Sequence, residues 1–244
     1  MPNFDKLIND FICRINRSNI ITQYYNEEAI RNELGAFLKK ELEATDPGKY
    51  LVQYERNVGY FKKLKIKTHN NDFIKKEMDI VVFENDIDIT KLREKIPICA
   101  VELKFIRQNT DNFNITATPP DNLYHYLQDI QFSEELKFAG VENTYAILFS
   151  NHKSIYSNPG RKITTYKNLY NIFRDVFDGT KILKKVKLDP TTILKDINDE
   201  LKSNGKKDVK IYNAHSLTWL THITSYIDEE NHNLELKYII EKAK

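Results

Sequence analysis

The sequence predicts an α/β fold, in which a central mixed β-sheet is flanked by helices and a C-terminal α/β extension follows residue 150. Three observations predict it: two segments of helical periodicity come first, three short strand-like segments follow, and a further helix and a buried strand complete the core. Only seven glycines and seven prolines occur, and no flexible linker marks a boundary. We therefore expect one continuous domain over residues 1–244, with a core at about residues 26–150 and an extension at 151–244.

Two helices are expected before the first strand. Residues 4–17 place apolar side chains at helical spacing. A second helix is indicated by Asn26, a favourable N-cap followed by acidic residues, and by the apolar positions within residues 30–42. It should end before the Asp-Pro-Gly sequence at 46–48, which favours a turn.

Strands are expected where β-branched, apolar and aromatic residues form short runs. The predicted core contains four such segments, at residues 50–60, 78–83, 96–105 and 144–150. Between the last two, Asp121 follows two prolines and is expected to be the N-cap of a helix that ends at Gly140. In the extension we expect short helices at 169–177 and 191–201, and a strand within 209–227 that leads up to Trp219.

The composition is that of a folded soluble protein, because 41% of the residues are hydrophobic and 30% are charged, a balance that excludes a disordered chain. The two cysteines, Cys13 and Cys99, form neither a disulfide framework nor a CxxC metal pattern, and Cys99 lies in an apolar run typical of a core. No apolar run approaches the roughly 18 residues that a membrane helix needs, and no signal peptide is evident. Glycine-rich phosphate loops are absent from the sequence. We therefore expect a cytoplasmic protein without a membrane partner or a nucleotide cofactor.

Two neighbouring strands carry the polar residues that indicate chemistry. Side chains alternate along a strand, so Glu102 and Lys104 point to one face while their apolar neighbours point to the other. Asp79 begins the preceding strand, and antiparallel pairing would bring its carboxylate beside that of Glu102. Paired carboxylates bind Mg²⁺, which can lower the pKa of a bound water and offset charge on a phosphate. A lysine beside them could orient the attacking hydroxide or stabilise the transition state.

These residues resemble the signature of the PD-(D/E)XK nuclease superfamily, which has an acid on one strand and (D/E)-x-K on the next. Asp79 matches the first acid, the triplet at 102–104 matches the second part, and Met78 stands where the superfamily's name has proline. The resemblance covers roughly residues 26–150 and implies a restriction-endonuclease-like core. It also implies an endonuclease that hydrolyses phosphodiester bonds in DNA with Mg²⁺, for which Mn²⁺ would substitute, in a restriction, defence or repair setting.

The resemblance implies a role for each site residue. Asp79 and Glu102 would be metal ligands, and Lys104 would activate water. The superfamily often adds a glutamate from the helix before the sheet; Glu33 is the residue expected to support the metal, directly or through water, and Glu28 is the alternative. Breaking a duplex takes a second copy of the site or a second binding event, so a homodimer is one expected arrangement. These residues do not distinguish DNA from RNA.

The triplet alone is a weak signal, because Glu-Leu-Lys occurs twice more, at 135–137 and 235–237. Both of these copies lie in predicted helices and lack an acid-bearing strand upstream. The copy at 102–104 has the strand before it and the helix and strand after it, and this context selects it.

Two basic stretches could contact the phosphates of a nucleic acid. Residues 153–187 contain nine Lys or Arg and two Asp, and residues 56–76 contain seven basic residues and one Asp. Phosphate contacts of this kind supply affinity that falls with salt. The residues expected to make them are Lys62, Lys63, Lys65, Arg161, Lys162, Lys167 and Arg174. The alternative is that these side chains are simply solvated on exposed turns.

Two other functions are consistent with the same residues. A catalytically silent nucleic-acid-binding module would bind whether or not Asp79 is replaced. A protein-interaction module on the same fold would show no salt-dependent affinity for nucleic acid. The presence of Asp79, Glu102 and Lys104 together favours the nuclease.

Overall fold

The computed structural model shows an α/β protein whose chain divides into two compact units. Unit 1 contains residues 1–103, 132–146 and 242–244, and unit 2 contains residues 104–131 and 147–241. The expectation of one continuous domain stays a prediction. The residues that the structure describes are 1–17, 26–64, 66, 76–85, 89–106, 119–152, 155, 166–173, 176–178, 181–183, 187–220, 226–227, 233–234 and 236–244. None of the helices within these residues combines the length and the apolar character needed to cross a membrane.

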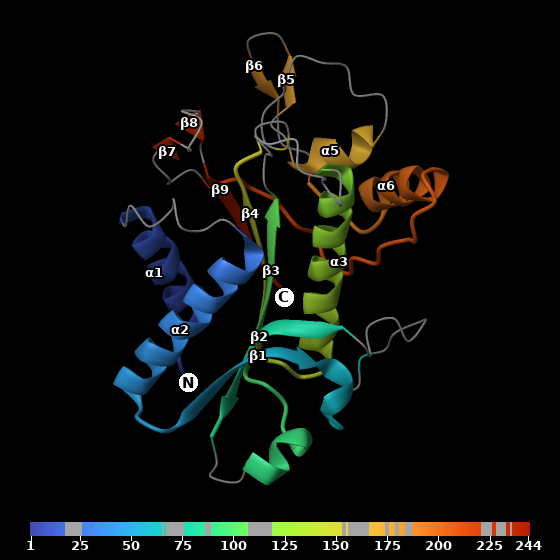
Figure 1. The fold of residues 1–244 in the computed structure, drawn as a ribbon. Coiled ribbons are helices and arrows are strands. Elements are labelled where there is room, and N and C mark those ends of the chain that lie inside the picture. The colour runs from blue at the N-terminus through green and yellow to red at the C-terminus, as the bar shows by residue number, and fades with distance from the viewer. Residues whose placement is uncertain are drawn as a thin grey trace. The chain divides into compact units, whose positions relative to one another are not determined.

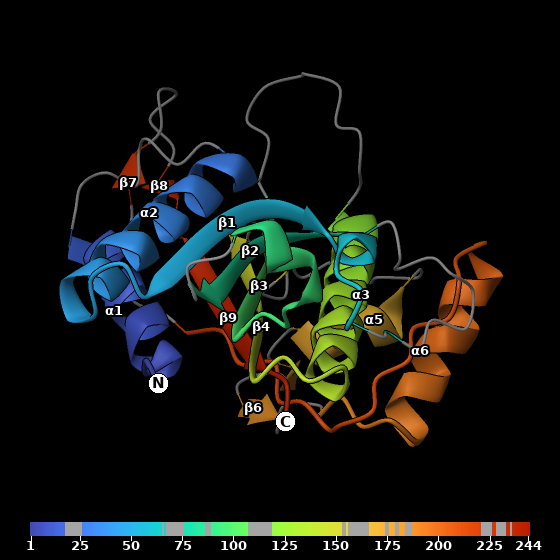
Figure 2. The same ribbon diagram turned by 90° about the horizontal axis from the view of Figure 1, so that it is seen from below.

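The first two helices lie where the sequence predicts them. Helix α1 spans Phe4–Arg17 and α2 spans Glu27–Thr45. The Asn26 side chain accepts a hydrogen bond from Ala29 N–H at 2.8 Å, which satisfies one of the backbone donors left open at the start of α2. Both views show α1 beside α2, and α2 next to strand β1 (Tyr50–Asn57) (Figures 1 and 2). The second helix therefore approaches the edge strand of the sheet.

A five-stranded mixed sheet, flanked by helices, has the strand order β1-β2-β3-β4-β9. Strands β1, β2 and β3 form an antiparallel meander, in which Val52 pairs with Val82 and Val82 pairs with Cys99. All four strands that the sequence predicts for the core are present, and β9 adds a fifth from the C-terminal extension. The bounds of the four strands after β1 are Glu77–Glu84 (β2), Cys99–Ile106 (β3), Asn143–Ser150 (β4) and Lys237–Lys242 (β9).

Two of these strands are shorter than predicted. The first ends at Asn57, whose side chain accepts a hydrogen bond from Gly59 N–H and starts a short 3-10 helix over Val58–Tyr60. The third begins at Cys99 rather than at residue 96, after the 3-10 helix Ile89–Glu94. Pro97 precedes it, and a proline cannot donate a hydrogen bond to the ladder.

Helix α3 spans Pro119–Phe138 and begins two residues before the expected N-cap. The prediction that Asp121 is the N-cap is wrong, because proline suits the first turn of a helix and the helix already includes both prolines. Asp121 lies inside the first turn instead, where its carboxylate pairs with Lys206 Nζ at 2.6 Å. Gly140 follows the end of the helix as predicted, in the left-handed region with φ of +102°.

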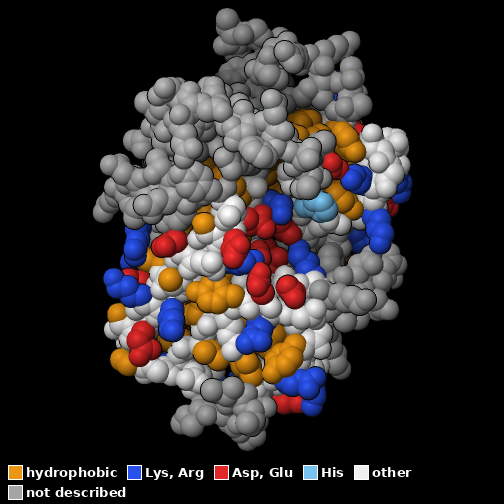
Figure 3. Space-filling model, in the orientation of Figure 1, with side chains coloured by type: hydrophobic (Ala, Val, Ile, Leu, Met, Phe, Trp, Pro, Cys, Tyr) orange, Lys and Arg blue, Asp and Glu red, His pale blue; other side chains and the backbone are white. Residues whose placement is uncertain are grey.

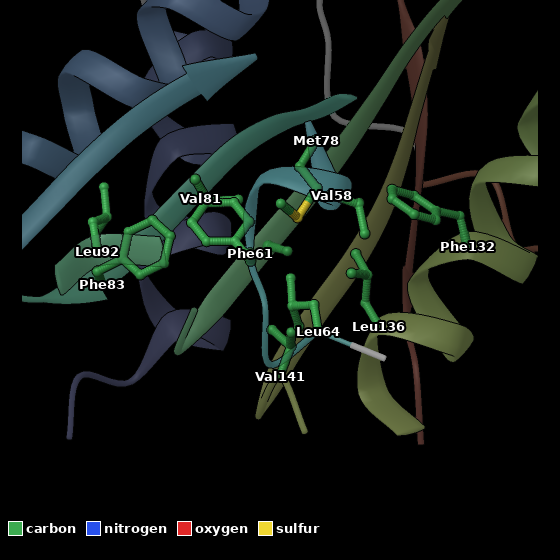
Figure 4. Packing of buried hydrophobic residues seen from close by; sticks show 11 residues of the cluster. Val58, Phe61, Leu64, Met78, Val81, Phe83, Leu92, Phe132, Leu136 and Val141 are labelled. Carbon is green, nitrogen blue, oxygen red and sulfur yellow. The ribbon is translucent and has the colours of Figure 1, made fainter. Parts of the chain in front are cut away.

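The core of unit 1 is an apolar cluster built from the sheet and from the second half of α3. Figure 4 shows Met78, Val81 and Phe83 of β2 spread along this cluster, with Phe132 and Leu136 of α3 towards the end where Met78 lies and Phe83 at the opposite end. The buried members of this cluster expose 7% of their surface or less, so they stabilise the strands that carry the candidate site. The other buried members are Val58, Phe61, Leu64, Leu92, Ala100 and Val141.

Unit 2 is built from shorter elements. They are α5 (Lys167–Phe173), α6 (Thr192–Ser203), the strand pair β5 (Val176–Asp178) and β6 (Lys181–Leu183), and the strand pair β7 (Tyr226–Ile227) and β8 (Asn233–Leu234). The Glu200 carboxylate of α6 accepts hydrogen bonds from the N–H groups of Asn168 and Leu169, at 3.2 and 3.0 Å. A side chain from one helix therefore caps the N-terminus of another.

Three sequence predictions for the extension need correction. The helix expected at 169–177 ends at Phe173, because residues 176–178 form β5. No extended strand leads to Trp219: over the described residues 209–219 the only strand-like pairing is a bridge at His215. One reason is that the Asn198 amide bonds both backbone groups of Val209, at 2.9 Å each, in place of a neighbouring strand. Lys237, the last residue of the triplet at 235–237, is not helical either, since it begins β9.

The first helix is tied to the last strand within unit 1. The Tyr145 hydroxyl donates a hydrogen bond to Asp5 Oδ1 at 2.7 Å, and Lys242 Nζ pairs with Asp5 Oδ2 at 2.8 Å. Burial acts to raise the pKa of Asp5, but the hydrogen bonds from Lys242 and Tyr145 outweigh it and hold that pKa below its usual value.

The two cysteines lie in different environments, and Cys99 lies in the core, as the sequence predicts. Cys99 on β3 is fully buried, and burial raises the pKa of its thiol well above the usual value. Cys13 on α1 is exposed. Cys99 is thus a small core residue.

Candidate active site

The pairing of β2 with β3 brings the two predicted acidic ligands together. The ladder ends where Ile80 pairs with Val101, and the same antiparallel register continued by one position sets Asp79 opposite Glu102. Directly opposite residues of an antiparallel pair have Cβ atoms about 4.5–5.5 Å apart. Asp79 is also held against β3 itself, because its Oδ2 accepts a hydrogen bond from Leu103 N–H at 2.8 Å. The register and this hydrogen bond hold Asp79 against β3 beside Glu102, and the role of these two residues as metal ligands stays a prediction.

A third carboxylate continues this row on the edge strand. Tyr54 pairs with Ile80 and Arg56 pairs with Met78, so Glu55 lies between these two pairs, opposite Asp79, although the ladder does not pair Glu55 with Asp79. Glu55 has a φ of +50°, a left-handed conformation that is uncommon for residues other than glycine. Its side chain is 55% exposed. Glu55, Asp79 and Glu102 therefore form a lateral row across three strands, which we call the acidic row.

Arg31 of α2 compensates the first two members of the acidic row. Its Nη2 lies 2.9 Å from Glu55 Oε1, and its Nη1 lies 3.4 Å from Asp79 Oδ1. The Arg31 side chain is only 14% exposed and that of Asp79 is 18% exposed, so water screens this contact less than a surface ion pair. One guanidinium group thus bridges two carboxylates from neighbouring strands.

Lys76 offsets the negative charge of Glu102, the third member of the acidic row. Its Nζ lies 3.4 Å from Glu102 Oε2 and 4.4 Å from the centre of the Phe132 ring. The Glu102 side chain is 4% exposed and that of Lys76 is 21% exposed. Burying a carboxylate this deeply in a sheet is costly unless a positive charge lies close by. Acidic side chains gather near the middle of the face drawn in Figure 3, with Lys and Arg side chains next to them.

Lys104, the third residue of the predicted signature, is half-buried on β3 two residues after Glu102. Because side chains alternate along a strand, it points to the same side of β3 as Glu102. The strand itself therefore sets the spacing of these two groups.

The structure does not bring Glu33 to the acidic row. Glu33 is exposed on α2, and two residues along a helix correspond to about 200° of rotation, so it lies on the opposite side of the helix from Arg31. Glu28, the alternative, is also exposed, but it lies three residues before Arg31 and therefore on the same side. Across the described part of the chain, no group of three or more His, Cys, Asp or Glu side chains is arranged to hold a metal ion.

Arg31, Glu55 and Lys76 are site residues that the sequence patterns did not indicate. One signal was available for Arg31: Gly35 stands in the helix interior one turn later, where glycine is unfavourable. A Cβ atom at Gly35 would lie 2.1 Å from Cε1 of Tyr54, so the glycine permits a close approach of α2 to β1. That close approach puts Arg31 within reach of the strands.

The predicted nucleic-acid contacts are only partly described. Lys62 and Lys63 are exposed after β1, and Lys62 forms an ion pair with Glu94. Lys167 is exposed at the first position of α5. The other four, Lys65, Arg161, Lys162 and Arg174, lie outside the described residues.

Comparison of the chain with protein-family models, with curated proteins and with solved structures found no match.

Proposed function

We propose that the chain is a metal-dependent endonuclease that hydrolyses phosphodiester bonds in DNA, on a core of the restriction-endonuclease-like kind. The observation that carries the proposal is the adjacency of Asp79 and Glu102 across β2 and β3, with Lys104 two residues further along β3. Two acids and a lysine on neighbouring strands supply the charges that phosphodiester hydrolysis requires.

The donor set fits a hard divalent cation. Mg²⁺ is commonly bound through one or two carboxylates, with water and substrate phosphate completing its ligands. Asp79 and Glu102 supply such a pair, and the Leu103 N–H fixes the orientation of one of them. The positive charges of Arg31 and Lys76 next to these carboxylates are what a pair of buried acids needs when no cation is bound. Mn²⁺ would be held by the same oxygen atoms.

In the proposed reaction Asp79 and Glu102 hold the cation. When bound, such a cation lowers the pKa of a water molecule and offsets charge that develops on the phosphate. Lys104 orients the attacking water with its ammonium group and stabilises negative charge in the transition state. Apolar packing beneath β2 and β3 keeps the two strands, and hence the two carboxylates, in register.

The test is cleavage of circular plasmid, linear single-stranded DNA and RNA with Mg²⁺, with Mn²⁺ and with EDTA. Asp79→Asn, Glu102→Gln and Lys104→Ala should each abolish metal-dependent cleavage. Glu84→Gln is the matched control, because Glu84 is an exposed carboxylate at the far end of β2 and its removal should leave cleavage unchanged. Uncut substrates with every cation would refute the nuclease proposal.

A second candidate function is a nucleic-acid-binding module without turnover. It is favoured by one observation: Asp79 and Glu102 each already face a cationic side chain at 3.4 Å. A structural role for these ion pairs needs no metal. This candidate predicts salt-dependent binding that Asp79→Ala leaves intact or strengthens, because removing a carboxylate reduces repulsion of phosphate.

A further inference from the structure

We propose that Arg31 is an exchangeable cation of the site: it pairs with Asp79 while no divalent cation is bound, and it binds a substrate phosphate once Asp79 has become a metal ligand. This inference rests on the proposed function and adds a phosphate-binding residue that the sequence signature does not contain. Three features of Arg31 and its surroundings support it.

The first feature is that the two contacts of Arg31 are unequal. The contact with Glu55 is 2.9 Å long, within the range of a charge-assisted hydrogen bond, whereas the contact with Asp79 is 3.4 Å long and therefore weaker. Asp79 meanwhile keeps its own hydrogen bond from Leu103 N–H through the other oxygen. A cation that approached Asp79 would thus break the weaker of the two Arg31 contacts and leave Arg31 anchored to Glu55.

The second feature is the unused hydrogen-bonding capacity of Arg31. A guanidinium group has five N–H donors in a planar fork, which matches two oxygen atoms of a phosphate. The Nη1 and Nη2 atoms face carboxylates, and Nε is buried with no hydrogen-bond partner within the described part of the chain. Buried donors of charged groups are normally bonded, so a ligand that offers further oxygen atoms here would be stabilised.

The third feature is the charge of the site before and after a cation binds. Counted with Lys104, the acidic row with Arg31 and Lys76 has no net charge, because three carboxylates stand against three cationic side chains. A divalent cation changes this to plus two, which favours binding of phosphodiester groups. The cation therefore repels Arg31 from Asp79 and at the same time makes the site attractive to the anion that Arg31 would bind.

The experiment compares Arg31→Gln and Arg31→Lys in two binding measurements. Binding of Mn²⁺ alone is measured by calorimetry, and binding of a DNA oligonucleotide in the presence of Mn²⁺ is measured by fluorescence anisotropy in a Lys104→Ala background that should not cut it. Arg56→Gln is the matched control: Arg56 lies next to Glu55 on β1, but its Nε donates to the neutral Gln53 side chain at 2.7 Å. Arg56→Gln removes one positive charge, as Arg31→Gln does, without changing the acidic row.

We expect opposite changes from Arg31→Gln. Mn²⁺ should bind more tightly, roughly five- to tenfold, because a unit positive charge has been removed a few ångströms from a ligand. The oligonucleotide should bind at least about tenfold more weakly, because the phosphate loses a two-pronged donor. Arg31→Lys keeps the charge and should leave Mn²⁺ binding near wild type while still weakening DNA binding.

A purely structural role for Arg31 would move both affinities in the same direction, and that result would overturn the inference. So would unchanged affinities in Arg31→Gln and Arg31→Lys when the wild type cuts DNA; in that case the nuclease proposal stands alone. If the wild type binds neither Mn²⁺ nor DNA, both proposals fail. Thermal unfolding of the two Arg31 variants shows whether they are folded, and Arg31→Lys keeps the test decisive if the glutamine variant is not.

Discussion

The ion pair between Lys76 and Glu102 should be asymmetric in its contribution to stability. Lys76→Gln removes the cation and leaves a carboxylate that is 4% exposed, whereas Glu102→Gln removes the buried charge itself and keeps the shape of the side chain. We predict that the first change is clearly destabilising and that the second is nearly neutral. The double variant should resemble Glu102→Gln alone.

The magnitudes follow from the exposure of the two partners. Removing one partner of a fully buried ion pair costs about 3–5 kcal/mol. Because the Lys76 side chain is 21% exposed, water already screens part of the pair, and we expect about 1–3 kcal/mol, including the loss of its contact with the Phe132 ring. Glu102→Gln should change the free energy of unfolding by no more than about 1 kcal/mol in either direction. The variant loses the ion pair with Lys76, but it also no longer carries the desolvation cost of a buried carboxylate, and these two effects oppose each other.

The assay is urea unfolding of the wild type, the two single variants and the double variant, followed by far-UV circular dichroism. The four free energies form a double-mutant cycle, and the coupling energy between the two side chains should be about 1–3 kcal/mol, equal to the cost of Lys76→Gln alone. In a thermal scan a loss of 1 kcal/mol corresponds to about 2–4 °C for a chain of this size. Leu103→Ala supplies a reference for ordinary core damage, at about 2–5 kcal/mol.

Two results would refute the reasoning. If Lys76→Gln is as stable as the wild type, Glu102 does not need that cation. If Glu102→Gln is the more damaging of the two, the carboxylate stabilises the fold, and the idea that it is retained for function at the expense of stability loses its support.

Three further predictions concern other parts of the molecule. With a thiol reagent at mildly alkaline pH, Cys13 should react in the native protein and Cys99 only after denaturation, so the number of accessible thiols rises from one to two. The pKa of Asp5 is lowered in the folded protein, so the ionised carboxylate contributes stability above its ordinary pKa of 3.8. That contribution is lost as the pH falls through the folded-state pKa. The difference in free energy of unfolding between wild type and Asp5→Asn should therefore shrink on acidification. Glu200→Ala should destabilise the protein by about 1–2 kcal/mol and speed hydrogen exchange at the first amides of α5, whereas Glu200→Gln, which keeps an acceptor, should do less of both.

Much of the order of helices and strands could be predicted from the sequence, because each element of the core carries a strong local signal. Asn26 caps α2, and the short apolar runs form β2, β3 and β4. The antiparallel pairing of β2 with β3 was expected from chain order, since strands that follow one another in the sequence are usually neighbours in the sheet. Local periodicity and chain order were sufficient there.

The remaining site residues depend on contacts that periodicity does not encode. Arg31 reaches Asp79 across 48 positions of the chain, and its approach depends on the fit of Gly35 against Tyr54. Glu33 was chosen by the resemblance alone, although its angular position on the helix relative to Arg31 was open to calculation. In the extension, side-chain amides such as Asn198 satisfy backbone groups that a strand would otherwise pair, which no pattern of apolar residues reveals.

The attachment of the first helix to the last strand has a consequence for how the protein is made. Asp5 and Lys242 are separated by 237 positions, and Asp5 and Tyr145 by 140. At a synthesis rate of about 5–20 residues per second, Lys242 is synthesised on the order of ten to fifty seconds after Asp5. During that interval the hydroxyl of Tyr145 arrives first. Unit 1 therefore stays incomplete until residues 242–244 have been synthesised, and until then α1 lacks its ion pair with β9.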